Sequence, residues 1–357
     1  MDSSLNPFEL IWPAEHLETL EACPLCGDIR RSLLHGDLQD TAFGISPGVW
    51  RLWMCGGCRA AYLNPRPTVE TIGRAYSNYY THLVKGANPE LPTSPLIKNI
   101  RQLIGNGYTN KKFGTRRFPA SVLGYYLISL LIRKKRKIDR IFRHLEVEAN
   151  MKNRKLLDVG CGSGDFLVQA EKCGWSALGL DFDEKAITVA RSRGATAYLG
   201  PIETLADQSG AFDVITLSHS LEHLHDPKAA LNLCWKLLNP GGVLWIETPN
   251  IDSLGYQYFG GNWRGIEAPR HLVIFNKHSL TSALLDVGFN NVEWKRQDNL
   301  REGIFKSSEV LEANTRAASQ PQQRPNLLLK RICSLFERDP VSSAEFLTVK
   351  CTRPLSK

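Results

Sequence analysis

The residues best suited to chemistry lie in the segment LLDVGCGSGDFL (156–167). Its pattern predicts a buried strand, then a turn with three alternating glycines, then the start of a helix. Such a turn lets a ligand lie against bare backbone at the carboxyl end of a strand. A dinucleotide turn needs a glycine where this chain has Asp165. Asp158 would repel a pyrophosphate, but it suits a cationic amino group.

A second carboxylate follows about 20 positions downstream, where acidic residues of nucleotide-binding folds hold a ribose. The segment LGLDFD (178–183) predicts a strand that ends at Asp181. A carboxylate there can accept hydrogen bonds from both ribose hydroxyls. The two segments together predict a site for a nucleoside that carries a cationic group.

Four cysteines near the start of the chain could bind a metal. Cys23 and Cys26 form one C-x2-C pair, Cys55 and Cys58 form another, and 28 residues separate the pairs. Four thiolates in this pattern suit tetrahedral zinc and leave no open coordination position. We expect a structural Zn2+ ion in a zinc-ribbon-like module, with free thiols or a redox pair as the alternatives.

Candidate general bases lie in two segments. His219, Glu222 and His223 follow a predicted strand with a spacing that would place them on one face of a helical turn. The segment NWRGIEAPRHLVIF (262–275) follows the next strand and brings cationic, aromatic and basic groups together. We expect His271 to be the first choice of base and His223 the second. The alternatives are structural histidines and a loop held by Arg–Glu pairs.

The elements that must position these residues alternate between strand and helix from about residue 155 to 300. This alternation predicts an α/β fold, a doubly wound and mainly parallel sheet with helices on both faces. Asp226-Pro227 predicts a helix start, and Pro240-Gly241-Gly242 follows its end. Later strands are expected at 290–297 and 345–354.

Five segments, taken in chain order, resemble motifs of class I S-adenosylmethionine-dependent methyltransferases: LDVGCGSGDF, GLDFD, GPIETL (200–205), FDVITLSHSLEHLHDP (212–227) and LNPGGVLWIETPN (238–250). The resemblance implies a Rossmann-like seven-stranded sheet of order 3-2-1-4-5-7-6, with S-adenosylmethionine as cofactor. The implied cofactor-binding set is Asp158, Gly160, Cys161, Gly162, Gly164, Asp181, Phe182, Glu203 and His219. Many relatives have an acidic residue where this chain has Pro201, so the adenine contact falls to Glu203 or to backbone.

Two narrower resemblances concern the front module and the loop at residue 219. The four-cysteine front resembles the zinc-binding module that precedes the Rossmann domain in a group of bacterial small-molecule and sugar methyltransferases. The implied domains are 1–80 for zinc, 81–150 for a basic connecting segment and 151–357 for the methyltransferase. In quinone-biosynthesis O-methyltransferases the matching loop is thought to hold a divalent metal through two glutamates and a histidine, but here His219 takes the first glutamate position.

The net charge of +8 comes from one part of the chain, because residues 98–155 hold 16 Lys and Arg against 3 Asp and Glu. Within it, the apolar stretch VLGYYLISLLI (122–132) precedes IRKKRKIDRIFRHL (132–145). The apolar stretch is too short to span a membrane. The segment therefore has three interpretations: a helix packed on the domain, a surface for an anionic substrate or RNA, or peripheral membrane contact through residues 122–145.

The function expected from these features is methyl transfer to oxygen of a small or conjugated metabolite, such as a nucleotide-sugar or polysaccharide precursor. The acceptor pocket at 262–275 suits a polar and even anionic molecule. An RNA base methyltransferase is an alternative, although no N-P-P-[FY] motif follows the predicted fourth strand, and a non-catalytic cofactor-binding module is another. A cytoplasmic location is expected, with reduced cysteines and an optional contact with the inner membrane face, because no signal-peptide pattern is visible.

Overall fold

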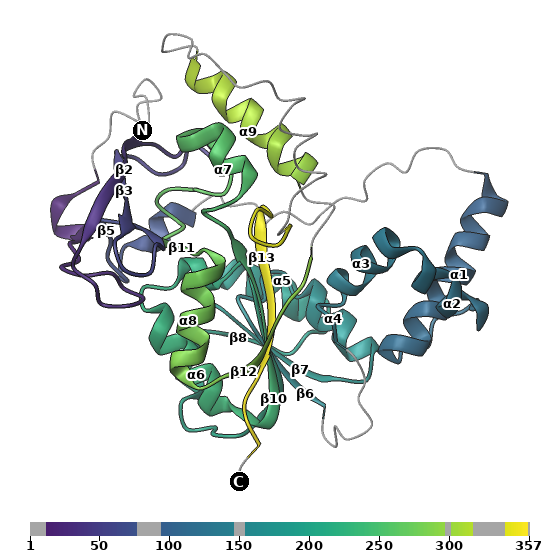
Figure 1. Ribbon diagram of the computed structural model, residues 1–357. Helices are drawn as coiled ribbons and strands as arrows, with labels where there is room; N and C mark the ends of the chain where they lie inside the picture. The colour runs from purple at the N-terminus through teal and green to yellow at the C-terminus, as the bar shows by residue number, and fades with distance from the viewer. Residues whose placement is uncertain (1–11, 77–93, 146–153, 297–300, 317–339, 356–357) are drawn as a thin grey trace. The chain divides into compact units, whose positions relative to one another are not determined.

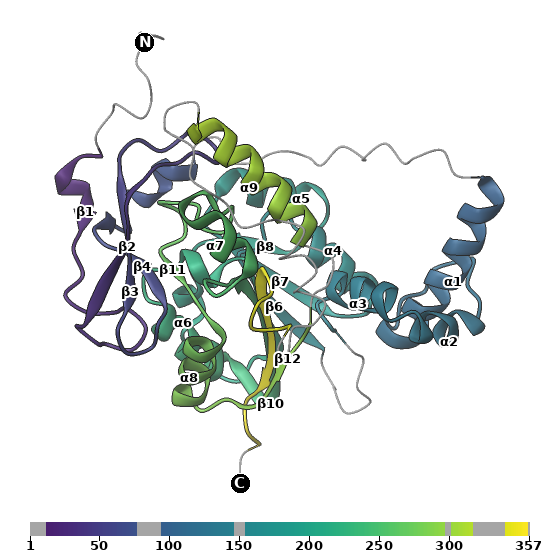
Figure 2. The same cartoon turned by 45° about the horizontal axis from the view of Figure 1, so that its top comes forward.

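The computed structural model describes residues 12–76, 94–145, 154–296, 301–316 and 340–355. These residues form a seven-stranded, a four-stranded and a two-stranded sheet, with the helices shown in Figures 1 and 2. The seven strands are β6 (Lys155–Val159), β7 (Ser176–Asp181), β8 (Ala197–Leu199), β9 (Phe212–Ser218), β10 (Leu238–Pro249), β12 (Asn290–Trp294) and β13 (Phe346–Thr352).

The order of the large sheet is β12-β13-β10-β9-β6-β7-β8. The pairs β6–β7, β6–β9 and β7–β8 are parallel. Strand β13 runs antiparallel to β10, because the backbone of Gly241 pairs with Arg353 while that of Asn250 pairs with Glu345. Numbered along the chain, this is the order 3-2-1-4-5-7-6. The predicted Rossmann-like methyltransferase fold is confirmed.

Local sequence signals account for the helix boundaries around this sheet. Helix α5 (Glu184–Ser192) begins after Asp183, whose side chain accepts hydrogen bonds from two backbone amides of the first turn. Helix α6 (Pro227–Leu237) begins after Asp226, which accepts one from the amide of Ala229 at 2.8 Å. Helix α8 (Lys277–Val287) begins at a capping box on Asn276. These caps satisfy amides that a helix start leaves without partners.

The described residues form two compact units, and each draws on separated parts of the chain. Among the described residues, the first unit combines 12–76, 219–235, 246–296, 301–316 and 340–351, and the second combines 94–145, 154–218, 236–245 and 352–355. These boundaries differ from the divisions at 80 and 150 that the sequence suggests. The physical reason is that both units take in strands and loops that lie far from one another along the chain.

The first unit contains the four-stranded sheet of order β11-β4-β3-β2. Its strands are β2 (Arg31–Leu38), β3 (Trp50–Cys55), β4 (Ala61–Leu63) and β11 (Val273–Ile274). Strand β11 pairs antiparallel with β4, so that Val273 lies opposite Tyr62. The zinc-ribbon-like region is therefore completed by a strand more than 200 residues downstream. The unit also holds the β1 (Leu17–Glu18) and β5 (Arg66–Pro67) pair and the helices α7 (Leu254–Phe259) and α9 (Arg301–Arg316).

The second unit contains the helices of the basic region, α1 (Pro95–Phe113), α2 (Leu123–Leu130) and α3 (Ile132–Ile141). Tyr108, Phe113 and Ile128 share one buried core cluster with Leu156 of β6 and Leu167 of α4 (Asp165–Lys172). Residues 94–145 are thus packed on the methyltransferase sheet instead of only connecting two domains. No helix among the described residues combines the length and apolar character needed to cross a membrane.

Helices α1 and α2 approach each other closely at two glycines. A Cβ atom at Gly107 would overlap the carbonyl oxygen of Ser121, and one at Gly124 would overlap that of Ile104. The amide of Ser121 donates a hydrogen bond to the carbonyl of Leu103 at 3.0 Å, which fixes the crossing. The glycines therefore set the distance between the two helices.

We expect Gly107→Ala to lower the free energy of unfolding by about 1–3 kcal/mol, because the added methyl group must displace backbone. Gly105→Ala is the matched control in the same helix, since a Cβ atom there meets nothing within 4 Å. The control should raise stability by roughly 0.5–1 kcal/mol through helix propensity. Urea unfolding of both variants measures the difference, and equal stabilities would contradict the close approach.

Candidate functional site

The glycine turn after β6 has the geometry that the sequence predicts. Gly160, Gly162 and Gly164 have φ values of 76°, 51° and 75°, all in the left-handed region. A Cβ atom at Gly164 would lie 2.8 Å from the Cβ atom of Ala190 on α5. At Gly162 a Cβ atom would meet nothing within 4 Å. Gly164 thus lets α4 start close to α5, and Gly162 leaves space beside the turn for a ligand.

Asp158 is fully buried at the end of β6. Its Oδ1 atom accepts hydrogen bonds from Thr216 Oγ1 of β9, at 2.6 Å, and from the guanidinium of Arg143. Its Oδ2 atom has no hydrogen-bond partner among the described residues. Burial raises the pKa of Asp158, although Arg143 and Thr216 oppose the rise. A buried carboxylate oxygen without a donor favours a cationic or amino group beside it.

Arg143 is a member of this site that the sequence analysis missed. Its guanidinium donates to Asp158 and, at 2.8 Å, to Thr216 Oγ1, and it lies 3.8 Å from the ring centroid of Phe166. It follows α3 with a φ of 46°, outside helical geometry. Arg143 is one of several cations in a strongly basic segment, so the sequence alone does not show which of them contacts Asp158. Its buried neighbours Asp158 and Thr216 mark it as functional only in three dimensions.

Asp181 and the glycine turn lie close together. Asp181 Oδ2 accepts a hydrogen bond from the amide of Gly162 at 2.8 Å, and Oδ1 accepts one from the amide of Asp183 at 3.0 Å. Burial raises the pKa of Asp181, and the two amides oppose the rise. The carboxylate is therefore held in one orientation at the end of β7, with lone pairs left for further donors.

The other members of the expected cofactor-binding set differ in exposure. Cys161 is buried within the turn, and burial raises the pKa of its thiol. Phe182 is 54% exposed, and Glu203 is exposed on the 3-10 turn Ile202–Leu205. His219 follows β9, whose residue Leu217 pairs with Val159 of β6. Cofactor contacts by these four residues stay predictions.

The loop after β9 places His219 between two carboxylates. Its Nε2 atom lies 3.0 Å from Glu247 Oε1, and its Nδ1 atom lies 3.5 Å from Glu222 Oε1. Burial alone would lower the pKa of His219, but Glu222 and Glu247 outweigh it and raise the pKa to about 9. The expected shared helical face is only partly present, because His219 has a φ of 54° and precedes the 3-10 turn Leu221–His223.

Glu222, His223 and His271 form a compact cluster in the first unit. Each offers one ligand atom, and these atoms lie within 4.8 Å of one another. The carbonyls of Arg270 and Gly265 lie 2.9 Å and 2.8 Å from Nδ1 of His223 and His271. Because a carbonyl only accepts, each Nδ1 carries the proton, and each Nε2 keeps its lone pair.

The three side chains of this cluster differ in burial and charge. Glu222 is fully buried, and the nearby histidines lower its pKa against the effect of burial. His271 is 5% exposed, and burial lowers its pKa to about 4. His223 is partly exposed, and its Nδ1 atom also lies 3.0 Å from the hydroxyl oxygen of Tyr76. With Glu222 ionised and His271 neutral at neutral pH, the cluster offers ligand atoms for a cation.

The charged residues of segment 262–275 form ion pairs within the fold. Arg270 is fully buried, and its guanidinium pairs with the carboxylate of Asp40. Its Nε atom lies 3.6 Å from Glu267 Oε2. Arg264 pairs with Glu267, and Trp263 donates to Glu345 at 2.8 Å. The alternative of a loop held by Arg–Glu pairs describes this segment, and its cations do not form an exposed anion site.

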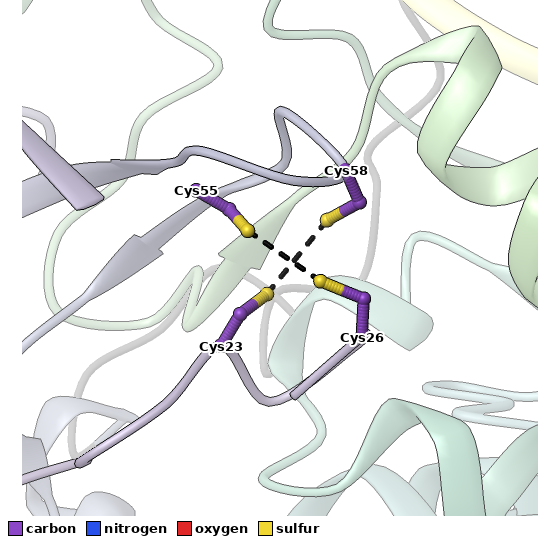
Figure 3. Close-up of side chains that lie close together, drawn as sticks. All are labelled: Cys23, Cys26, Cys55 and Cys58. Atoms are coloured by element: carbon purple, nitrogen blue, oxygen red, sulfur yellow. Dashed lines mark hydrogen bonds between the residues drawn. The ribbon is translucent and has the colours of Figure 1, made fainter. Parts of the chain in front are cut away.

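The four cysteines converge from two tight turns, as Figure 3 shows. The Sγ–Sγ distances are 3.7 Å for Cys23–Cys58 and 3.5 Å for Cys26–Cys55. Four sulfurs at 2.3 Å from a tetrahedral zinc ion would be about 3.8 Å apart. A hydrogen bond from Cys58 lowers the pKa of Cys23 to about 5. The geometry and the chemistry of the donor set fit a metal.

Comparison with known proteins agrees with the sheet and the turn. A family model described as "Methyltransferase domain" matches residues 131–294. The matched region, slightly less than half of the chain, is similar to a methyltransferase domain and contains strands β6 to β10 and β12. The front module with its four cysteines lies outside that match.

Relatives with this domain include proteins named "Ubiquinone biosynthesis O-methyltransferase". The one from Bordetella avium is 33% identical over 120 residues, and the one from Methylococcus capsulatus is 37% identical over 119. The matches cover 32% and 31% of this chain and 50% of each relative, so the chain spans about half the length of these curated relatives. A solved methyltransferase from Archaeoglobus fulgidus is 19% identical with a TM-score of 0.41, covering 69% of this chain and 97% of that one.

The raised pKa of His219 predicts a pH-dependent part of the stability. The imidazolium pairs with Glu222 and Glu247, so this contribution is complete below pH 6.5 and is lost as the pH rises through about 9. We expect His219→Gln to destabilise the fold by about 1–2 kcal/mol at pH 6 and by much less at pH 10, after allowing for the partial exposure of the side chain.

Urea unfolding at the two pH values measures this difference. The exposed His278 on α8 is the matched control, and His278→Gln should show no comparable pH dependence. A destabilisation by His219→Gln that is the same at both pH values would rule out the ion pairs as its cause.

Proposed function

We propose that this protein transfers a methyl group from S-adenosylmethionine to an oxygen atom of a small or conjugated metabolite. The buried, donor-free Oδ2 of Asp158, beside a turn joined to Asp181, is the observation that supports it most directly. The methyltransferase domain match over residues 131–294 supports the activity, and the names of the relatives favour oxygen as the methylated atom.

Residues of the second unit would hold the cofactor. Asp158 Oδ2 would accept a hydrogen bond from the amino group of the methionine end, where opposite charges attract in a low-dielectric site. Asp181 would accept hydrogen bonds from the ribose hydroxyls, and Gly162 leaves space for the chain of the ligand. Bound S-adenosylmethionine supplies a methyl group that its sulfonium already activates. The chain therefore has to align the acceptor and exclude water.

The general base would come from His271 or His223. Both keep an unprotonated Nε2, because their Nδ1 protons go to backbone carbonyls. The lowered pKa of His271 keeps it neutral, whereas the greater exposure of His223 gives it easier access to a substrate hydroxyl. Glu222 beside them would stabilise the imidazolium that forms when either histidine takes the proton.

A nucleotide-sugar or polysaccharide precursor is the acceptor class that we favour. Its support is the layout, a four-cysteine module ahead of the methyltransferase domain. Arg264 and Arg270 no longer support an anionic acceptor, because carboxylates of the fold pair with both. RNA is the second candidate, and the cations of α3 are the observation that favours it.

We also propose that Cys23, Cys26, Cys55 and Cys58 bind a structural Zn2+ ion. Sulfur separations of 3.5 and 3.7 Å, close to those of a tetrahedral site, support this assignment. Four cysteine ligands leave no place for substrate or water, so the ion would stabilise the turns that carry Cys23–Cys26 and Cys55–Cys58.

Transfer of labelled methyl groups to nucleotide-sugars, quinones and bulk RNA tests the activity. We expect label in a small acceptor, and Asp181→Ala should weaken cofactor binding by about 1–3 kcal/mol in calorimetry, as for a lost charged hydrogen bond. The exposed Asp207→Ala in the same unit is the control and should bind like the wild type. No cofactor binding by the wild type would support the non-catalytic alternative, and label found only in RNA would support the second candidate.

Metal analysis tests the cysteine cluster. We expect one zinc ion per chain in the freshly purified protein and a loss of zinc in Cys55→Ser. Cys173→Ala is the control, since Cys173 is buried in the core of the second unit and should leave the zinc content unchanged. Chelation should lower the melting temperature of the wild type. Zinc-free wild-type protein with the same stability would refute the assignment.

A further inference from the structure

The exposed apolar side chains of this protein concentrate on one set of helices. Of the 22 large hydrophobic side chains that are exposed among the described residues, 12 lie between residues 96 and 141. We call the central part of this region the α2 surface; its apolar members are Phe118, Val122, Leu123, Tyr126, Leu127, Leu130, Leu131 and Ile132. Contiguous apolar groups of this kind mark interaction sites.

Helix α2 presents four of these side chains, Leu123, Tyr126, Leu127 and Leu130, to solvent along one face. Gly124 and Ile128 are buried, and they face α1 and the core of the second unit. Leu123, Leu127 and Leu130 recur at helical spacing on the other face and are 67%, 45% and 79% exposed. The exposure is therefore a property of a well-packed helix. We therefore expect replacement of these three leucines to leave the helix folded.

Cations border the α2 surface at both ends. Arg116 and Arg117 immediately precede Phe118, and α3 begins with Ile132 and continues as Arg133-Lys134-Lys135. The acidic residue of α3, Asp139, is buried and accepts hydrogen bonds from Tyr108 and Lys112. It therefore does not neutralise the lysines at the start of the helix, none of which pairs with a carboxylate of the described chain.

We propose that the α2 surface docks on an anionic lipid bilayer. The leucines of α2 would enter the boundary between headgroups and acyl chains, and the flanking cations would contact phosphate headgroups. Within the second unit, both views show α1 and α2 on the side of α3 and α4 that faces away from strands β6–β8 (Figures 1 and 2).

Other occupants fit the surface less well. Nucleic acid would pair with the cations and could stack on Phe118 and Tyr126, but the other six members of the surface are aliphatic side chains that offer no stacking platform. A second copy of the chain would bring two strongly cationic α3 helices together, and their mutual repulsion opposes such a dimer. A bilayer with anionic lipids complements both the apolar centre and the basic border.

Co-sedimentation of the full chain with lipid vesicles tests the proposal. We expect binding to vesicles of phosphatidylcholine mixed with phosphatidylglycerol, weaker binding at high salt, and little binding to phosphatidylcholine alone. Leu123→Ser/Leu130→Ser removes the apolar centre, and Lys134→Gln/Lys135→Gln removes two charges. Each set should weaken binding at least about tenfold.

Matched controls are available elsewhere on the chain. Leu285→Ser/Val310→Ser replaces two aliphatic side chains that are 54% and 55% exposed, and Lys172→Gln/Lys185→Gln removes charge from the second unit. Both should bind vesicles like the wild type. Melting curves show that each variant is folded. Methyl transfer plays no part in the readout, so an inactive protein that binds vesicles still supports this proposal.

Several outcomes would overturn it: no binding of the wild type to anionic vesicles, equal binding to neutral vesicles, or equal losses in the control variants. A dimer in solution that Leu123→Ser/Leu130→Ser dissociates would assign the surface to a second copy. Binding to RNA that only the lysine variant loses, without binding to vesicles, would assign it to nucleic acid.

Discussion

A carboxylate buried inside a parallel sheet is the constraint on which the cofactor site depends. Asp158 has no exposed surface, yet it lies on a central strand between β7 and β9. An isolated charge at this position would cost several kcal/mol. Thr216, one strand away in register, and Arg143, from the connection after α3, compensate part of the cost. The Oδ2 atom of Asp158 has no donor among the described residues, and it therefore favours a cationic ligand at the end of the strand.

The parallel register of β6 and β7 also positions the other residues of the site. Asp158 pairs with Gly179 on β7, and that pairing places the end of β7 beside the glycine turn. Asp181 can then accept a hydrogen bond from the amide of Gly162. This bond joins the second carboxylate to the glycine turn. Gly179 itself lacks a side chain where Leu167 and Cys161 lie within 3 Å of a Cβ position. The small residue on β7 thus allows the turn to lie close to the sheet.

A comparable constraint organises the first unit. Arg270 and Asp40 are both fully buried and are separated by 230 residues along the chain. Each needs the other, because an uncompensated buried charge is strongly destabilising. The pair, together with the β4–β11 ladder, ties the segment that carries His271 to the sheet that carries Cys55. The histidine cluster is therefore held by the same contacts that complete the front module.

Sequence patterns predict the parts of this protein that depend on local spacing. The glycine turn and the C-x2-C pairs follow from residues close together in sequence, whereas the strand order was implied by the resemblance to methyltransferase motifs. The roles of Arg264 and Arg270 did not follow, because their surroundings include Asp40 and Phe43 from the front of the chain. The two-residue strand β11 is too short to show a period of its own. Arg143 was hidden because cations fill its neighbourhood in sequence.

The basic helices show the limit of pattern analysis most clearly. An apolar stretch such as 122–132 predicts a buried helix, since burial of leucine stabilises a fold. In the structure the buried side is narrow, because Gly107 and Gly124 bring α1 and α2 into direct backbone contact. Side chains on that side are therefore small or few, and the leucines point away from it. Because Gly124 and Ile128 form the packing face of α2, its leucines are exposed, and exposed apolar groups of this kind are typical of interaction surfaces.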